Sequence, residues 1–292
     1  GQVASFGTKT FASAGVKEFR FSVVGKNAAS RSFAGHFDKL MLTGPKAVSF
    51  EAENLKFVTG GAKDAPAAPL PAPSGSTIAE AATAARDADV AIVFVGTTRA
   101  VEHEGRDRKS LGLSGRQQEL VKAVFAANPR TVVVQMSAGP LTVPWLKEHV
   151  PAMLQAWWPG EEGGHAIADV LFGDVNPSGR LPHTVYASEA QVPPLDEYDI
   201  SKGFTYMYVN GMPLFPFGHG LSYTTFAYSK LKLSKTEIKA DDTVDVSVEV
   251  SNTGKLAGDE VVQLYVRDVE CSVKRPGKEL RGFQRITLQP GE

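Results

Sequence analysis

The side chains best suited to chemistry gather in the loop at residues 96–108, directly after a continuous apolar run at 90–95. This loop carries three carboxylates, a histidine and three arginines, which are Glu102, Glu104, Asp107, His103, Arg99, Arg106 and Arg108. Carboxylic acids and histidine are common proton-transfer groups in enzymes. Open parallel sheets bind ligands beyond the carboxyl ends of their strands, where this loop is expected to lie. The alternative is a solvated loop in which Asp107 and Arg108 form surface pairs.

The segment before this loop predicts one helix and one strand. Thr77 and Glu80 form a capping-box pattern, which indicates a helix through about residue 87. The apolar run at 90–95 is typical of a strand that is covered on both faces.

The same order of elements follows the loop. Ser114 and Gln117 form a second capping-box pattern, and an apolar stripe at helical spacing comes after them. The later apolar runs predict strands at 131–136 and 152–158 and a helix near 162–172. Strands that alternate with helices predict an α/β domain, in which helices flank a mostly parallel sheet.

Both ends of the chain have the patterns of antiparallel β structure. Short alternating stretches such as 19–24 and 39–42 predict strands, and the turn-rich segments between them are 25–30 and 43–46. After Tyr228 valines alternate with polar residues, and Asn252-Thr253-Gly254 predicts a turn. The predicted domains are a β-sandwich insert tail at 1–58, a linker at 59–75, the α/β domain at 76–228 and a truncated β domain at 229–292.

Three long motifs in this order resemble glycoside hydrolase family 3. The segment 96–124 is similar to the acid/base loop of that family, with its Glu-x-Glu-Gly-x-Asp-Arg pattern. The segment 156–182 resembles the long signature of the family, and 214–226 resembles its junction with a fibronectin type III-like domain. The resemblance covers about residues 86–292, while 1–58 is similar to inserts of the protective-antigen or carbohydrate-binding type.

The resemblance implies a retaining β-glycosidase, a β-glucosidase before other types, that hydrolyses terminal β-linked sugars. In such an enzyme a carboxylate on one residue attacks the anomeric carbon while a carboxylic acid protonates the departing oxygen, with the two carboxyls about 5–5.5 Å apart. Glu104 is the expected acid/base. Glu102, His103 and Arg99 are weaker candidates for substrate contact. Glu102 is alternatively a charge partner of Arg99 or Arg106, and His103 alternatively a simple exposed histidine.

The resemblance places the nucleophilic aspartate on an N-terminal (β/α)8 barrel. A barrel needs about 250 residues, and these 292 residues do not alternate enough strands and helices to form one. The chain alone is therefore expected to be inactive, as a C-terminal portion of an extracellular or periplasmic enzyme whose partners are the barrel and a β-linked glycoside. The rival hypothesis is a non-catalytic carbohydrate-binding or interaction module.

Several other residues have simpler interpretations. The pattern favours a core position for Trp157 and Trp158 over stacking on a sugar ring, and a turn at 176–179. Cys271 is interpreted as structural. Thr205 stands where family members commonly have an arginine, so no role is transferred to it.

Composition and spacing exclude other classes of function. The 31 basic and 32 acidic side chains nearly cancel, so no charge field favours nucleic acid or a membrane surface. Gly-rich segments at 137–140 and 160–164 lack the spacing of nucleotide-binding loops, and no cofactor is expected. The histidines lack metal-ligand spacing, so no metal is expected either; they include His36, His149, His165, His183 and His219. No run of residues is long and apolar enough for a membrane span.

Overall fold

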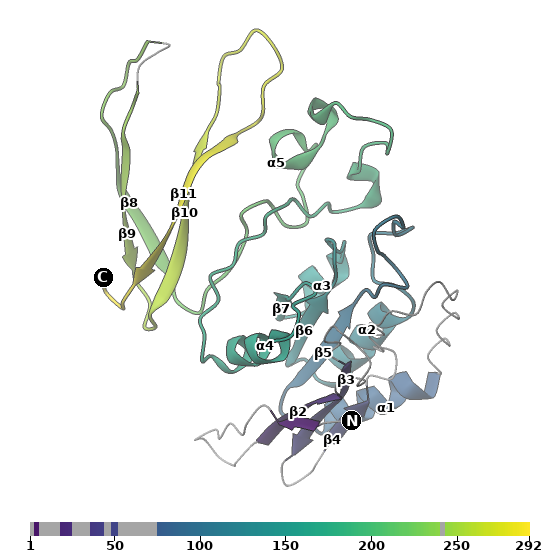
Figure 1. Cartoon of the computed structure of the whole chain (residues 1–292). Helices are drawn as coiled ribbons and strands as arrows, with labels where there is room; N and C mark the ends of the chain where they lie inside the picture. Colours follow the sequence, from purple (N-terminus) through teal and green to yellow (C-terminus); the bar gives the residue numbers. More distant parts are fainter. Residues whose placement is uncertain (1–2, 6–17, 25–35, 44–47, 52–74, 240–242) are drawn as a thin grey trace. The chain divides into compact units, whose positions relative to one another are not determined.

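A computed structural model describes residues 3–5, 18–24, 36–43, 48–51, 75–239 and 243–292 (Figure 1). The chain forms two compact units. Unit 1 comprises Gly1–Ala168 with Ala187–Glu189, and unit 2 comprises Asp169–Tyr186 with Ala190–Glu292. None of the described helices is long and apolar enough to cross a membrane.

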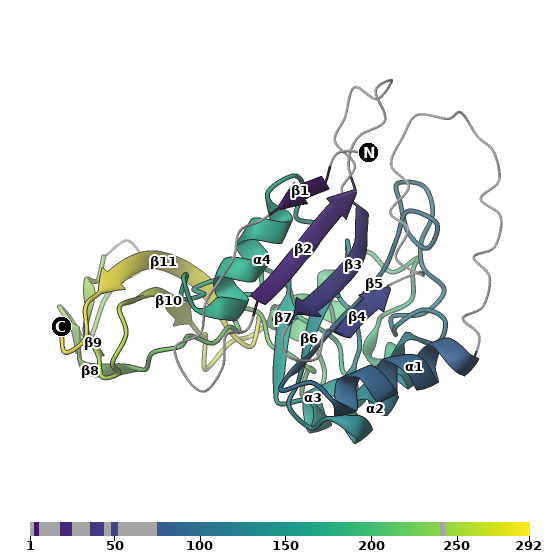
Figure 2. The same cartoon turned by 90° about the horizontal axis from the view of Figure 1, so that it is seen from below.

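The centre of unit 1 is a parallel sheet with the strand order β5-β6-β7. Its strands are β5 (Ala91–Gly96), β6 (Thr131–Met136) and β7 (Ala152–Gln155). The helices along this part of the chain are α1 (Gly75–Arg86), α2 (Gln117–Ala127), α3 (Pro144–His149) and α4 (Gly163–Phe172). Helices α1 and α2 lie side by side in both views (Figure 2). The predicted α/β class is confirmed.

The core of unit 1 contains the apolar residues that the sequence places on its central strands and helices. Val95, Val133 and Val134 of the sheet are almost completely buried, as are Val121 of α2 and Leu146 of α3. Because β-branched side chains pack well on a pleated surface, the valines at 95, 133 and 134 favour strands over helices at those positions. The sheet thereby gives the loop after β5 a rigid foundation.

Three predicted element boundaries are wrong. Helix α1 begins at Gly75 rather than Thr77. Helix α2 begins at Gln117, and its N-cap is Arg116, which forms no side-chain cap hydrogen bond. Strand β7 ends at Gln155 rather than residue 158, and Trp157, with a φ of 58°, has a left-handed conformation outside the extended region of a regular strand.

The second capping box fails for a specific reason. The Gln117 side chain bonds chiefly to the end of β5: Gly96 N–H donates to Gln117 Oε1 at 2.7 Å, and Gln117 Nε2 donates to the Gly96 carbonyl at 2.8 Å. Gln117 Nε2 also donates to Ser114 Oγ at 3.2 Å, so the two residues of the predicted box meet through their side chains. A tertiary contact therefore uses the side chain that the local pattern assigned to the helix terminus.

Gly96 itself sits where no larger residue fits. A Cβ at this position would lie 1.7 Å from the Met136 carbonyl oxygen on β6. We expect Gly96→Ala to destabilise unit 1 by about 1–3 kcal/mol, since the strand ends must separate. Tryptophan fluorescence during urea unfolding measures this, because Trp145, Trp157 and Trp158 are all in unit 1.

Gly112→Ala is the matched control for that substitution. The nearest atom to a Cβ at Gly112 is 3.5 Å away, so this change is expected to stay within about 0.5 kcal/mol of the wild type. Equal stability of the two variants would contradict the close approach of β5 and β6 at Gly96.

An antiparallel sheet with the order β1-β2-β3-β4 is formed by the described residues before α1 (Figure 2). Its strands are β1 (Val3–Ser5), β2 (Glu18–Val24), β3 (His36–Thr43) and β4 (Val48–Glu51). The strands predicted at 19–24 and 39–42 are confirmed. Residues 25–30 and 44–46 of the predicted turns, and linker residues 59–74, lie outside the described residues.

Unit 2 contains two antiparallel hairpins, β8-β9 and β10-β11. The strands are β8 (Phe226–Leu233), β9 (Val246–Asn252), β10 (Gly258–Val266) and β11 (Glu279–Leu288). Asn252 is 1% exposed and bonds to the segments on both sides of the predicted turn: it accepts from Thr224 Oγ1 at 2.7 Å and donates to the Leu256 carbonyl at 2.8 Å. This turn therefore carries the chain from one sheet to the other.

Three short helical segments precede β8. They are two 3-10 helices, at Glu189–Gln191 and Ile200–Lys202, and α5 (Thr205–Tyr208). Thr205 has a φ of 57°, an uncommon conformation for a β-branched residue.

Candidate active site

The charged loop leaves the carboxyl end of β5 and is fixed to the sheet at its first residue. Thr97 N–H donates to the Met136 carbonyl of β6 at 2.9 Å. The Thr98 carbonyl then accepts the N–H groups of Val101 at 2.8 Å and Glu102 at 3.0 Å, which forms one helical turn. The loop thus begins on rigid structure at the edge where parallel sheets bind ligands.

Glu104 occupies the tip of a tight hairpin turn. His103 and Arg106 exchange two backbone hydrogen bonds, of 3.2 Å and 2.9 Å, and Glu104 and Gly105 form the two-residue connection. Gly105 has a φ of 79°, as the third residue of a type II turn requires, so glycine is needed here.

The Glu104 side chain is exposed. Its carboxylate makes no hydrogen bond or ion pair within the part of the chain that the structure describes. His103, also exposed, donates from Nδ1 to the Glu104 backbone carbonyl at 2.6 Å. The turn therefore presents one unpaired carboxylate outward while its backbone is held in place.

Glu102 lies two residues before Glu104 and has the opposite environment. Its side chain is 12% exposed and forms an ion pair with Arg108, whose side chain is 9% exposed, at 2.8 Å. Glu102 also accepts hydrogen bonds from Thr97 Oγ1 and from the N–H of Ala138, the latter at 3.1 Å. Its carboxylate is therefore committed to holding the loop.

The expected charge partners in this loop need correction. Glu102 pairs with Arg108 and not with Arg99 or Arg106, both of which are exposed. Arg108 is not in a surface pair, as the solvated-loop alternative supposed, because its side chain is 9% exposed. The long Arg108 side chain turns inward because the Pro140 carbonyl accepts from its Nη2 at 2.8 Å, and that acceptor comes from a distant segment.

Trp158 links β7 to the same loop. Its indole Nε1 donates to the Thr97 carbonyl at 3.1 Å, and 37% of the residue is exposed. The prediction of a core position is therefore wrong for Trp158, because β7 ends at Gln155 and the left-handed Trp157 turns the chain outward. Trp157 is partly buried.

Glu189 is an anchor that sequence reasoning missed. Its Oε1 accepts from Ser110 Oγ at 2.7 Å and from Leu111 N–H at 2.9 Å, at the end of the charged loop. The Ser110 and Leu111 hydrogen bonds lower the pKa of the Glu189 carboxyl. No sequence signal connects these residues, which are separated by 78 and 79 positions.

The other histidines and Cys271 are dispersed. His149 stacks on Trp145 with ring centroids 4.4 Å apart, and His219 stacks on Phe215 at 5.3 Å. Among the residues that the structure describes, no three His, Cys, Asp or Glu side chains converge as metal ligands would. Cys271, interpreted as structural from the sequence, is exposed.

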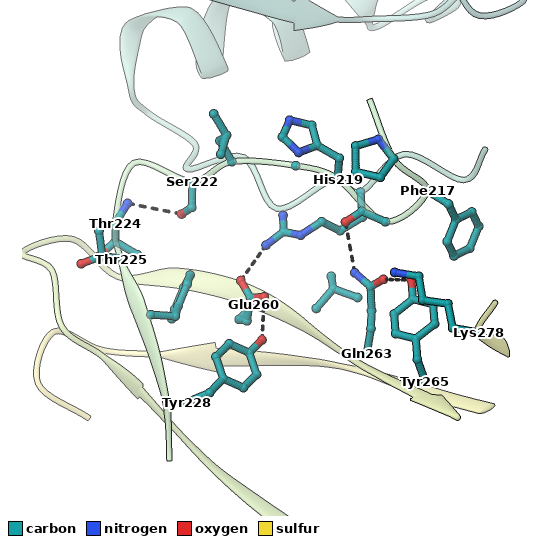
Figure 3. Close-up of a pocket in the computed structure, with 17 residues that line it drawn as sticks. Phe217, His219, Ser222, Thr224, Thr225, Tyr228, Glu260, Gln263, Tyr265 and Lys278 are labelled. Atoms are coloured by element: carbon teal, nitrogen blue, oxygen red, sulfur yellow. Dashed lines mark hydrogen bonds and ion pairs between the residues drawn. The ribbon is translucent and has the colours of Figure 1, made fainter. Parts of the chain in front are cut away.

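A hollow of about 620 Å³ lies within unit 2, between residues 216–222 and β10 (Figure 3). Its polar lining groups pair with one another: Glu260 accepts from Arg180 at 2.6 Å and from the Tyr228 hydroxyl at 2.8 Å, while Gln263 donates to the Gly218 carbonyl at 3.2 Å. Burial and the Glu260 carboxylate raise the pKa of the Tyr228 hydroxyl. Because these polar groups already have partners, we interpret the contacts as structural: they hold residues 180 and 218 against β10.

Asn176, which the sequence analysis assigns to a turn, also forms three side-chain hydrogen bonds in unit 2. Its Oδ1 accepts from Ser222 Oγ at 2.9 Å and from Tyr223 N–H at 2.8 Å, and its Nδ2 donates to the Ala257 carbonyl at 3.0 Å. The side chain thereby connects three segments that are far apart in sequence.

Two family models match the chain. Residues 16–223 match the glycosyl hydrolase family 3 C-terminal domain, and residues 260–292 match a fibronectin type III-like domain. The second match coincides with β10 and β11 and confirms the predicted domain type there.

Curated relatives and solved structures agree with these matches. A beta-xylosidase of Formosa agariphila is 46% identical over 218 residues, 73% of this chain and 30% of the relative. A periplasmic beta-glucosidase of Salmonella typhimurium is 42% identical over 228 residues, 74% of this chain and 30% of the relative. A beta-glucosidase of Kluyveromyces marxianus, solved in complex with glucose, superposes with a TM-score of 0.68 at 41% identity, over 74% of this chain and 27% of that one. The chain spans about 30% of the length of the curated relatives.

Proposed function

The chain belongs to glycoside hydrolase family 3, and we propose that it supplies Glu104 as the general acid/base of a retaining β-glycosidase. The observation that carries this proposal is the tight turn at His103–Arg106, which presents an unpaired carboxylate beyond the carboxyl end of β5. A group that must exchange a proton with a substrate has to be accessible and free of other partners, and within the loop Glu104 meets both conditions while Glu102 does not.

The proposed reaction has two steps. First, the Glu104 carboxyl donates its proton to the glycosidic oxygen as the bond from that oxygen to the anomeric carbon breaks, while an aspartate attacks the anomeric carbon. Second, the Glu104 carboxylate takes a proton from a water molecule, which attacks the same carbon and releases the aspartate. We place that aspartate on a (β/α)8 barrel outside the residues that the structure describes.

The substrate class follows from the relatives. Those named above are a beta-xylosidase and beta-glucosidases, so we assign terminal β-linked glucosides and xylosides, glucosides first. The periplasmic relative supports a periplasmic or extracellular location.

The stereochemistry of hydrolysis tests the proposal. We expect proton NMR of a β-glucoside digest by the barrel-bearing enzyme to record β-glucose as the first product, because two displacements at one carbon retain its configuration. Mutarotation to the α-anomer follows only later. Initial release of α-glucose would contradict the proposal.

A carbohydrate-binding module without catalysis is the second candidate, and the exposed Trp158 is the observation that favours it, since aromatic faces stack on sugar rings. Calorimetry of the isolated chain against β-glucan oligomers separates the two. A self-sufficient module releases or absorbs heat with saturation, whereas half of an active site is expected to give no measurable binding.

A further inference from the structure

Glu102 and Arg108, which flank the turn at 103–106, are joined to each other and to residues 138–140 by one largely buried ion pair. Glu102 Oε2 lies 2.8 Å from Arg108 Nε. Both side chains also form hydrogen bonds to the backbone of residues 138–140. Ala138 N–H donates to Glu102 at 3.1 Å, and Arg108 Nη2 donates to the Pro140 carbonyl at 2.8 Å. The pair therefore closes the loop at its base and fixes it to the chain that follows β6.

Gly139 leaves room for this packing. A Cβ at Gly139 would lie 3.0 Å from Arg108 Nη2 and 3.6 Å from Glu102 Oε2, closer to the guanidinium than ordinary contacts allow. The Arg108 guanidinium thus lies close to the Gly139 backbone, where no side chain intervenes. Arg108 Nη1 is buried and forms no hydrogen bond among the described residues, so the charge of Arg108 depends on Glu102 for its compensation.

The tip of the loop has few contacts of its own. Residues 103–106 are exposed, and two backbone hydrogen bonds close their turn. The position of Glu104 relative to the sheet is consequently set by the base of the loop. Catalysis is sensitive to that position, because a misplacement of about 1 Å of a reacting group can cost roughly 100-fold in rate.

We propose that Glu102 and Arg108 are positioning residues: their buried ion pair holds the hairpin tip so that the Glu104 carboxyl reaches the glycosidic oxygen. This inference rests on the proposed acid/base function of Glu104. It assigns Glu102 no contact with substrate, in contrast to the candidate substrate contact of the sequence analysis.

The first test measures the mobility of the loop in the 292-residue chain itself. In Glu102→Gln we expect the hydrogen-bonded amides within 103–107, those of His103 and Arg106, to exchange hydrogen faster than in the wild type, while amides of β6 exchange at an unchanged rate. Glu119→Gln is the matched control, because it breaks an exposed ion pair with Arg116 in the same unit. Unchanged exchange at 103–107 in Glu102→Gln would overturn the proposal.

A milder variant covers the case in which Glu102→Gln unfolds unit 1 and β6 exchanges faster as well. Thr97→Val removes one hydrogen bond to Glu102 and keeps the shape of a side chain that is 1% exposed. We expect faster exchange at 103–107 in this variant too, and unchanged exchange there would count against the proposal.

The second test measures kinetics in the barrel-bearing enzyme. We expect Glu102→Gln to lower kcat/KM about 10- to 100-fold for alkyl glucosides, whose departing oxygen needs a proton, and clearly less for aryl glucosides with acidic leaving groups. A merely structural residue would lower both equally by reducing the folded fraction, and that outcome would overturn the proposal.

Kinetics of Glu104 variants test the proposed function independently of the positioning inference. If these variants fail to depend on the leaving group, the proposed function itself fails. If they do depend on it and Glu102→Gln does not, only the positioning inference fails.

Discussion

Replacement of Glu104 by alanine in the barrel-bearing enzyme is expected to lower kcat/KM for alkyl β-glucosides by about 100- to 10,000-fold, the usual contribution of a general acid/base. Aryl glucosides with acidic phenols as leaving groups need little protonation to depart, so their first step is expected to retain far more of its rate. Their second step still lacks a base, and the glycosyl-enzyme therefore accumulates. Rates measured across a series of leaving groups check this expectation.

Azide provides a second readout for the same variant. Azide is a nucleophile that needs no deprotonation, so it is expected to restore part of the turnover of aryl glucosides and to yield a glycosyl azide. Asp107→Asn is the matched control, because it removes an exposed carboxylate three positions away in the same loop and is expected to stay near wild-type activity. A uniform loss across leaving groups in Glu104→Ala, without azide rescue, would refute the acid/base assignment.

Local sequence patterns predict the elements that position this loop well, since the strand at 90–95 is a continuous apolar run and the strand at 131–136 is apolar apart from Thr131 and Gln135. Strand β6 has the predicted bounds and β5 is shifted by one residue. Such runs are sufficient because a strand buried on both faces needs apolar side chains at nearly every position. Element termini are less predictable where a polar side chain has a choice of partner, as Gln117 illustrates by bonding to Gly96 rather than capping α2.

In the candidate site, too, local features can be predicted from the sequence and long-range contacts cannot. The turn around Glu104 is a local feature, and Gly105 at its third residue is a signal that a sequence displays. The partner of Glu102 is not local. Three arginines lie within six residues of it, and the choice of Arg108 depends on Gly139 and Pro140, which approach only once β5 and β6 pair. Spacing along the chain therefore cannot identify the ion pair.

Breaking the ion pair between Arg180 and Glu260 in unit 2 is expected to cause the largest loss of stability. Arg180 and Glu260 are 80 positions apart, and their side chains are 11% and 12% exposed. Arg180→Met keeps the apolar stem of the side chain but leaves the Glu260 carboxylate with the Tyr228 hydroxyl as its remaining partner in the hollow. Removal of one member of a buried ion pair costs about 3–5 kcal/mol, since the other charge stays buried and uncompensated. We expect a loss of this size for unit 2.

Hydrogen exchange of the amides of β10 and β11 measures that loss, because all three tryptophans belong to unit 1 and their fluorescence does not monitor unit 2. Lys230→Met is the matched control: it breaks an ion pair with Glu249 in the same unit, where the side chains are 65% and 50% exposed, and about 0–1 kcal/mol is expected. The double variant Arg180→Met/Glu260→Leu should recover much of the loss, since it removes both charges together. If Arg180→Met were no more destabilising than Lys230→Met, the Arg180–Glu260 pair would stabilise unit 2 no more than an exposed ion pair does. That result would contradict a structural role for the polar contacts in the hollow.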